Sequence, residues 1–197
     1  MKIALLLNWG LGLEVLKVFH SLQNIDISFV VTQFDPESTD IWKNVVYNHS
    51  LMLGYKTISQ EKLSFEKLQK EIEENDVDLL LSHAFMKIFP KSIIIAPKFG
   101  CINIHASLLP KYRGASPTKL VLKNKEKQTG LTTHYINEGI DTGDIIFQIK
   151  IPVKTDDTED SIIERLKSVV KKLIIESLSR INDPKFVAIS QTILANN

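Results

Sequence analysis

Two polar side chains that could act on a carbonyl carbon stand two residues apart in one short, apolar segment. Asn103 and His105 lie near the end of residues 99–105, which read as a buried strand. Side chains alternate across a strand, so both project from the same face. An amide donor beside an imidazole can stabilise the tetrahedral oxyanion that forms during acyl transfer. The pair could also be the polar end of a strand that faces water, and by itself it leaves both interpretations open.

A third candidate is an acidic residue in a glycine-rich loop. Asp141 lies between Gly139 and Gly143, and glycines allow the backbone to bend tightly. An acidic residue in such a turn is common, so its functional interpretation depends on what lies near it.

The start of the chain invites a nucleotide-binding interpretation. Gly10 and Gly12 open a predicted helix after the first strand, but Val15 stands where the dinucleotide pattern has its third glycine. The second predicted strand also ends without an acidic residue. We therefore predict no NAD site, although a glycine turn that leads into a helix can still hold a substrate phosphate.

Other catalytic patterns are missing from the sequence. Cys101 is the single cysteine, and neither Cys-x-x-Cys nor His-Glu-x-x-His occurs, so we predict no metal site. Ser107 lacks the Gly-x-Ser-x-Gly pattern of serine hydrolases. His83 and His134 are predicted to be structural, although His134 precedes the Asp141 loop and could support a site there.

Strand and helix patterns alternate along the chain, and this alternation must position these side chains. We predict strands at residues 3–7, 25–32, 77–82, 100–105, 130–136 and 144–151. We predict helices at residues 11–22, 41–53, 61–75 (with Ser59 as N-cap), 91–96, 115–123, and from Asp157 or Thr158 to about residue 179. The pattern indicates an α/β fold: a single Rossmann-like domain with a mostly parallel sheet, helices on both faces and an antiparallel edge late in the chain. Its expected extent is residues 1–182, followed by a short tail over 183–197.

Composition is that of an ordinary globular protein. The 197 residues are 44% hydrophobic and 24% charged, with a net charge of +1. This charge predicts neither nucleic acid nor membrane as a partner. A single cysteine fits a reducing compartment, and the apolar run at residues 3–7 is too short for a signal peptide. We expect a cytoplasmic protein that could form a homodimer.

Three segments together resemble the folate-dependent formyltransferases, which move a formyl group from N10-formyltetrahydrofolate to an amine. They are residues 103–117 (Asn-Ile-His through Tyr-Arg-Gly-Ala-Ser-Pro), residues 129–146 around Asp141, and residues 82–90. The matches occur in the family's order and cover most of residues 77–155, with a weaker match over 1–60. The resemblance implies an enzyme of the formyltransferase fold with N10-formyltetrahydrofolate as the formyl donor.

The resemblance also implies the catalytic residues, Asn103, His105 and Asp141. Asp141 would pair with His105, favouring its cationic form and orienting the ring. His105 and the Asn103 amide would stabilise the oxyanion, and a water held by Asp141 or His105 would relay the proton from the amine to N10 of the folate.

Two further sets of residues are implied for the substrates. For the pteridine of the folate they are Phe85, Met86, Lys87, Ile88, Phe89, Glu138, Gly139 and Ile140, although some of the apolar ones could simply be core. For the acceptor they are Asn8, Trp9, Gly10, Gly12, Lys111, Tyr112 and Arg113. Trp9 could instead be a packing aromatic, and Arg113 a structural clamp on the turn after Pro110.

The acceptor amine is suggested by finer details. The sequence Tyr112-Arg113-Gly114 and the loop at residues 8–12 are more similar to the sugar N-formyltransferases, which act on nucleotide-linked 4-amino-deoxysugars. Members acting on glycinamide ribonucleotide usually have Tyr-Pro-Gly there, and they are the alternative. Members acting on methionyl-tRNA carry a basic surface, which a net charge of +1 does not favour. A formylfolate hydrolase or a non-catalytic folate-binding module also stays open.

Overall fold

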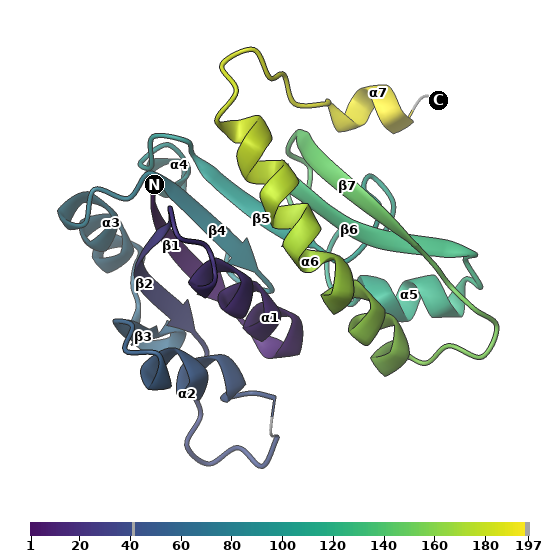
Figure 1. Cartoon of the computed structure of the whole chain (residues 1–197), viewed down its shortest axis with the longest axis horizontal. Coiled ribbons are helices and arrows are strands. Elements are labelled where there is room, and N and C mark those ends of the chain that lie inside the picture. Colours follow the sequence, from purple (N-terminus) through teal and green to yellow (C-terminus); the bar gives the residue numbers. More distant parts are fainter. Residues whose placement is uncertain (41, 196–197) are drawn as a thin grey trace. The chain divides into compact units, whose positions relative to one another are not determined.

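The structure is a computed structural model that describes residues 1–40 and 42–195 (Figure 1). Its contacts divide the chain into two compact units, residues 1–102 and residues 103 onward. Each unit is described by itself below. The expected catalytic domain over residues 1–182 and tail over 183–197 stay predictions.

The first unit is built on parallel strands. In it β1 pairs with β2 and β4, and β2 pairs with β3, all in parallel; the first residues of β5 follow next to β4. The strands are β1 (Lys2–Leu7), β2 (Asp26–Thr32), β3 (Thr57–Ser59), β4 (Leu79–His83) and β5 (Cys101–His105). Every side chain of β1 from Ile3 to Leu7 is fully buried, which is why the strand reads as a continuous apolar run.

Helices and one 3-10 turn connect these strands. They are α1 (Trp9–His20), α2 (Val45–Met52), the 3-10 turn η1 (Gln60–Lys62), α3 (Phe65–Glu74) and α4 (Lys91–Ile94). Helix α1 contacts β1, and α2 contacts β2 and β3. The apolar side of α1 is buried through Leu11, Val15, Leu16 and Phe19, the helical spacing that predicted it.

One predicted helix boundary in this unit is wrong. Ser59 ends strand β3 and precedes the 3-10 turn, so it does not cap the helix that follows. The cap is Ser64, whose Oγ accepts a hydrogen bond from the Lys67 N–H at 3.3 Å. Both serines precede acidic and apolar residues, and the sequence did not distinguish them. The preceding helix was predicted from residue 41, which falls outside the described residues, but α2 begins only at Val45, after a turn over 42–44.

The second unit combines an antiparallel pair with a long helix. Strands β6 (Gln128–Tyr135) and β7 (Ile145–Pro152) pair antiparallel, as expected late in the chain, and the end of β5 lies next to β6. Gly130 of β6 passes so close to β7 that a Cβ there would lie 1.9 Å from the Ile149 carbonyl oxygen. A side chain is therefore excluded at this position.

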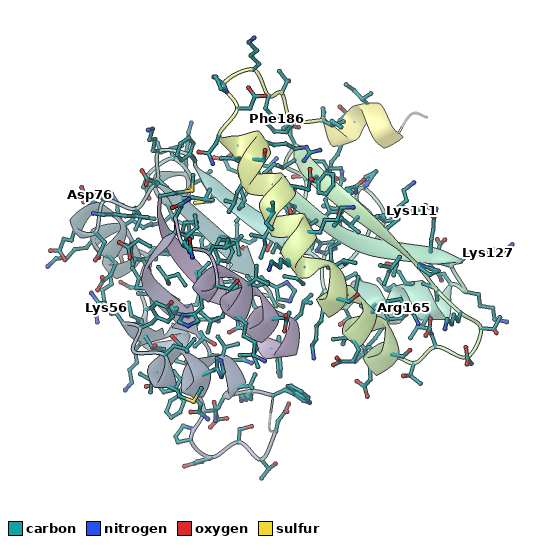
Figure 2. All side chains as sticks on the ribbon, viewed as in Figure 1. Lys56, Asp76, Lys111, Lys127, Arg165 and Phe186 are labelled. Carbon is teal, nitrogen blue, oxygen red and sulfur yellow. The ribbon has the colours of Figure 1, made fainter. Side chains whose placement is uncertain are left out.

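Helix α6 (Glu159–Ile181) packs on both strands and starts as predicted near Thr158. Thr158 and Ser161 form a reciprocal capping box. Arg165, labelled in Figure 2, donates to both oxygens of Asp157 at 2.8 and 2.7 Å and to the Pro152 carbonyl at 2.7 Å. These bonds tie the first turns of the helix to the end of β7.

The remaining helices of this unit are α5 (Pro117–Lys123) and α7 (Gln191–Ala195). The sequence did not predict α7, which is short and has no strong periodicity. The segment that leads to it passes Phe186, labelled in Figure 2, and then pairs with β7 through Ile189 and Ile145. Within the part of the chain that the structure describes, no helix is both long and apolar enough to cross a membrane.

Candidate active site

The structure brings together the three side chains that the sequence singled out as catalytic, all within the second unit. Asn103 and His105 lie two residues apart at the end of β5, and Asp141 lies in the loop between β6 and β7. The Asn103 Nδ2 donates to Asp141 Oδ1 at 3.2 Å. The His105 Nδ1 lies 3.3 Å from Asp141 Oδ2. One carboxylate therefore contacts both partners, with one oxygen for each.

The Asp141 loop is held in a conformation that few side chains allow. Asp141 has a φ of 51°, in the left-handed region that favours glycine, although aspartate tolerates it better than most residues. Its Oδ2 accepts a hydrogen bond from the Gly114 N–H at 2.8 Å. At Gly143 a Cβ would lie 1.8 Å from the Tyr135 carbonyl oxygen, so only glycine fits. Close packing of this loop thus directs the carboxylate toward His105.

The hydrogen-bond partner of His105 indicates which nitrogen of its ring carries a hydrogen. Its Nε2 lies 2.7 Å from the Tyr112 carbonyl oxygen, which can only accept, so Nε2 carries the hydrogen. In the neutral imidazole Nδ1 is then an acceptor, and this nitrogen faces Asp141. The ring is buried, with an exposed fraction of 6%. His105 is thus oriented to take up a proton at Nδ1.

A fourth side chain joins the cluster. His134 of β6 is buried, and its Nε2 lies 3.2 Å from Asn103 Nδ2 and 3.4 Å from Asp141 Oδ1. Its Nδ1 donates to the Tyr135 carbonyl oxygen at 2.8 Å. From the sequence we predicted that His134 is structural and could support a site at the Asp141 loop. Its place on a strand that enters the Asp141 loop was the signal that could have identified it.

Burial and charge shift the pKa values of the two ionisable groups that we predict to be catalytic, Asp141 and His105. Burial alone would raise the pKa of Asp141, but its hydrogen bond with His134, the charge of His105 and the Gly114 N–H outweigh it and lower the pKa to about 2. Burial lowers the pKa of His105 below its ordinary value, while Asp141 and the Tyr112 carbonyl act in the opposite direction. We expected Asp141 to keep His105 cationic; its charge does favour the cation, but burial has the larger effect.

The predicted pteridine-side residues divide between buried and exposed. The rings of Phe85 and Phe89 stack with centroids 5.2 Å apart, and Phe89 is buried. Met86 and Ile88 are largely exposed, at 73% and 64%. The Lys87 Nζ donates to two backbone carbonyls of the same unit at 3.2 Å. Apolar surface in this segment is therefore available on Met86 and Ile88.

The other three predicted pteridine-side residues lie in the Asp141 loop. Ile140 is 60% exposed, and the Gly139 N–H donates to the Asn137 side chain at 3.1 Å. Glu138 is exposed. Their assignment to the pteridine stays a prediction.

Asn8, one of the residues predicted to contact the acceptor, already has hydrogen-bond partners in the first unit. Its side chain is buried, and its Nδ2 donates to the Ala84 carbonyl at 2.9 Å and to Gln60 Oε1 at 3.0 Å. Its Oδ1 accepts from the Gln33 N–H at 2.8 Å and from the Thr32 hydroxyl at 3.2 Å. The amide thus joins the ends of neighbouring strands, and a phosphate contact by this side chain would require these bonds to break.

The other residues of the first loop lie where α1 begins. Trp9 is 40% exposed with a φ of 64°, so packing does not fully explain it. Gly12 faces β1, where a Cβ would lie 3.2 Å from Leu7 Cβ, so its role is close packing of the helix on the strand. Gly10 is the second residue of α1. A contact of this loop with a phosphate stays a prediction.

The three candidate acceptor residues of the second unit already have partners. The Lys111 Nζ lies 3.2 Å from Glu126, and the Tyr112 hydroxyl donates to the same carboxylate at 2.8 Å. Arg113 donates from Nε and Nη2 to Gln191 Oε1 at 3.0 and 2.6 Å. This geometry fits the alternative interpretation of Arg113 as a structural clamp. The sequence carried no signal for Gln191.

Cys101, the single cysteine, is buried. Burial raises the pKa of the Cys101 thiol to about 12, so the thiol stays protonated. Among residues 1–40 and 42–195, no group of three or more His, Cys, Asp or Glu side chains could hold a metal ion.

The sequence of the chain is similar to those of known formyltransferases. The family described as formyl transferase matches residues 14–178. A methionyl-tRNA formyltransferase of Thermodesulfovibrio yellowstonii is 41% identical over 131 residues, which are 66% of this chain and 42% of that protein. One of Lysinibacillus sphaericus is 37% identical over 170 residues, 85% of this chain and 54% of that protein. The chain spans about half the length of these curated relatives.

Solved structures confirm the predicted fold class, an α/β fold with a mostly parallel sheet and helices. A phosphoribosylglycinamide formyltransferase of Bacillus halodurans superposes with a TM-score of 0.77 at 20% identity, covering 93% of this chain and 96% of its own. The sugar 3N-formyl transferase WlaRD superposes with a TM-score of 0.71 at 20% identity, covering all of this chain and 68% of its own.

Proposed function

The chain belongs to the formyl transferase family, and we propose that it transfers a formyl group from N10-formyltetrahydrofolate to an amine. The observation that carries the proposal is the contact of Asp141 with both Asn103 and His105 in a buried cluster. An amide donor, an imidazole with an accepting Nδ1 and an ionised carboxylate are the groups that amine attack on a formyl carbon needs.

In the first step the nitrogen lone pair of the acceptor amine attacks the formyl carbon. A bond forms between nitrogen and carbon, and the carbonyl electron pair moves to oxygen as an oxyanion. In the free enzyme the Asn103 amide donates to Asp141. We propose that substrate binding exchanges this bond for one to the developing oxyanion, since such donors tighten on the reacting atoms in the substrate complex.

The proton lost by the amine needs an acceptor and then a donor. Neutral His105 accepts it at Nδ1, directly or through a water held by Asp141, and the Asp141 carboxylate at 3.3 Å stabilises the imidazolium. The oxyanion then collapses, the bond between carbon and N10 breaks, and the imidazolium returns the proton to N10. His105 is neutral again when tetrahydrofolate leaves.

The exposed apolar side chains Met86 and Ile88 are our proposed surface for the flat pteridine of the donor. Sites for flat aromatic ligands are lined mainly by apolar side chains, which these two residues would supply. Replacing either with aspartate should therefore raise the KM for N10-formyltetrahydrofolate more than the KM for the amine.

For the acceptor we propose a nucleotide-linked 4-amino-deoxysugar, because residues 112–114 and the first loop resemble those of the sugar N-formyltransferases. Methionyl-tRNA is the second candidate, since curated relatives with that name are 32–41% identical to this chain. The net charge of +1 offers little general attraction to tRNA. Glycinamide ribonucleotide is the third.

The test supplies the purified chain with N10-formyltetrahydrofolate and, separately, methionyl-tRNA, glycinamide ribonucleotide and a set of nucleotide-linked 4-amino-deoxysugars. Release of tetrahydrofolate and formylation of the amine are measured together, with Asn103→Ala as the inactive control. We expect release only with an amino sugar. Release without any amine would identify a hydrolase, and formylation of methionyl-tRNA alone would replace the proposed acceptor.

A further inference from the structure

Gln191 is a buried polar residue near the end of the described chain that no catalytic step uses. It is the first residue of α7, and its exposed fraction is 1%. Both polar atoms of its side chain make two hydrogen bonds each within the second unit. Burial of a polar amide is costly unless its atoms are hydrogen-bonded, and here four bonds to specific neighbours offset that cost.

The amide nitrogen of Gln191 holds the catalytic loop. Its Nε2 donates to the backbone carbonyl of Asp141 at 2.8 Å and to that of Gly143 at 2.7 Å. These carbonyls belong to the residue with a left-handed φ and to the residue two positions later. Strained backbone persists where its surroundings fix it, and the bond to the Asp141 carbonyl acts directly on the strained residue, while the bond to Gly143 holds the end of the same loop.

The amide oxygen of Gln191 holds the segment on the other side of His105. Its Oε1 accepts from Nε and Nη2 of Arg113 at 3.0 and 2.6 Å. The residue before Arg113, Tyr112, accepts from His105 through its carbonyl, and the residue after it, Gly114, donates to Asp141. One amide therefore connects the two segments that hold His105 and Asp141.

The backbone around Gln191 is itself anchored to a strand. Two hydrogen bonds join Ile189 and Ile145, at 2.8 and 2.9 Å. Ile145 starts β7, directly after the Asp141 loop. The bridge therefore fixes the position from which the Gln191 side chain reaches the loop.

We propose that Gln191 is a positioning residue, which sets the contact between Asp141 and His105 by holding the loop carbonyls with its amide nitrogen and Arg113 with its amide oxygen. The proposal rests on the proposed function for its effect on catalysis, but the contact itself can be measured without any substrate. Asp141 and His134 are the titratable groups that face His105, and Asp141 raises its pKa. Looser positioning of Asp141 should therefore lower the pKa of His105.

The experiment uses the whole chain with Gln191→Met, which keeps the side-chain volume and removes all four hydrogen bonds. Gln191→Asn keeps an amide but is one methylene too short to reach both carbonyls, and it serves if the methionine variant does not fold. Thr192→Ala is the matched control, because this neighbour in α7 is exposed and its side chain contacts Ser190. Circular dichroism and melting temperature establish folding.

The first readout is the NMR titration of the His105 ring, compared with Asp141→Asn as the reference for a lost carboxylate. We expect the midpoint to move to lower pH in Gln191→Met, in the direction of Asp141→Asn, and to stay unchanged in Thr192→Ala. Adding Gln191→Met to Asp141→Asn should produce no further shift. The proposal is refuted if the His105 midpoint is unchanged in a folded Gln191→Met variant. It is also refuted if Gln191→Met adds its full shift to that of Asp141→Asn, or if neither Gln191 variant folds.

The second readout is formyl transfer to whichever acceptor the wild-type chain uses. We expect kcat to fall at least about tenfold, with the KM for N10-formyltetrahydrofolate within about threefold, because small displacements of catalytic groups act mainly on the chemical step. An unchanged kcat would contradict a positioning role. A wild-type chain without formyl transfer would refute the proposed function and leave the titration result standing.

Discussion

Replacing Asp141 with asparagine tests the centre of the proposed mechanism. The carboxylate lies 3.3 Å from His105 Nδ1, accepts from Asn103 and Gly114, and has a pKa lowered to about 2, so it is charged at every pH of interest. Asparagine keeps nearly the same volume and can still accept from the Gly114 N–H. The substitution thus removes the charge and one acceptor, and it leaves the Gly114 hydrogen bond and the backbone bonds from Gln191 in place.

The expected loss follows from the distance between the two charges. Coulomb's law with an effective dielectric constant of about 20 gives roughly 5 kcal/mol for unit charges separated by 3.3 Å. If the proton is about half transferred to His105 in the transition state, about 2.5 kcal/mol of stabilisation is lost. That corresponds to a decrease in kcat of roughly 70-fold. The KM for the formyl donor should change little, because the lost interaction forms with the proton transfer.

Steady-state kinetics with each substrate varied in turn measure this loss, and the pH dependence of kcat gives a second check. The acid limb of the wild-type profile reports protonation of His105, and it should move to lower pH in the variant because Asp141 raises that pKa. Asp144→Asn, at an exposed aspartate at the end of the same loop, is the matched control. A variant with normal kcat but greatly reduced affinity for N10-formyltetrahydrofolate would show that Asp141 binds ligand instead.

Three further predictions concern neighbouring residues. Asn103→Ala should lower kcat at least about a hundredfold, while the melting temperature stays near that of the wild type; near-normal turnover would remove its amide from the oxyanion step. Burial lowers the pKa of His105, so the unfolded chain takes up its proton first as pH falls below 6.5. The free energy of unfolding of the wild type, measured relative to that of His105→Gln by denaturant titration, should therefore decrease from about pH 7 toward pH 5. An increase would mean that folding raises the pKa of His105. Arg113→Ala should lower the melting temperature and kcat without a selective rise in either KM, since Arg113 holds Gln191; a selective rise for the acceptor would restore its substrate role.

Much of the fold could be predicted because it depends on local pattern. The continuous apolar run of β1 and the helical spacing of α1 are properties of a few neighbouring residues, and both elements formed within two residues of their predicted ends. The same holds for Thr158, whose hydroxyl caps α6 through a residue three positions later. The prediction of Ser59 as N-cap was wrong because a serine that could cap a helix locally was instead paired in β3, and Ser64 caps α3.

By itself the sequence determined that Asn103 and His105 share one face of a strand and that glycines surround Asp141, because alternation and glycine flexibility act over a few residues. Only the tertiary structure decided what these groups contact. Gln191 meets Asp141 across 50 positions and Arg113 across 78, and no local pattern reports contacts over such separations. Burial of His105 was likewise a tertiary outcome, and it reversed the expected direction of the pKa, since removal from water disfavours the cation more than one carboxylate favours it.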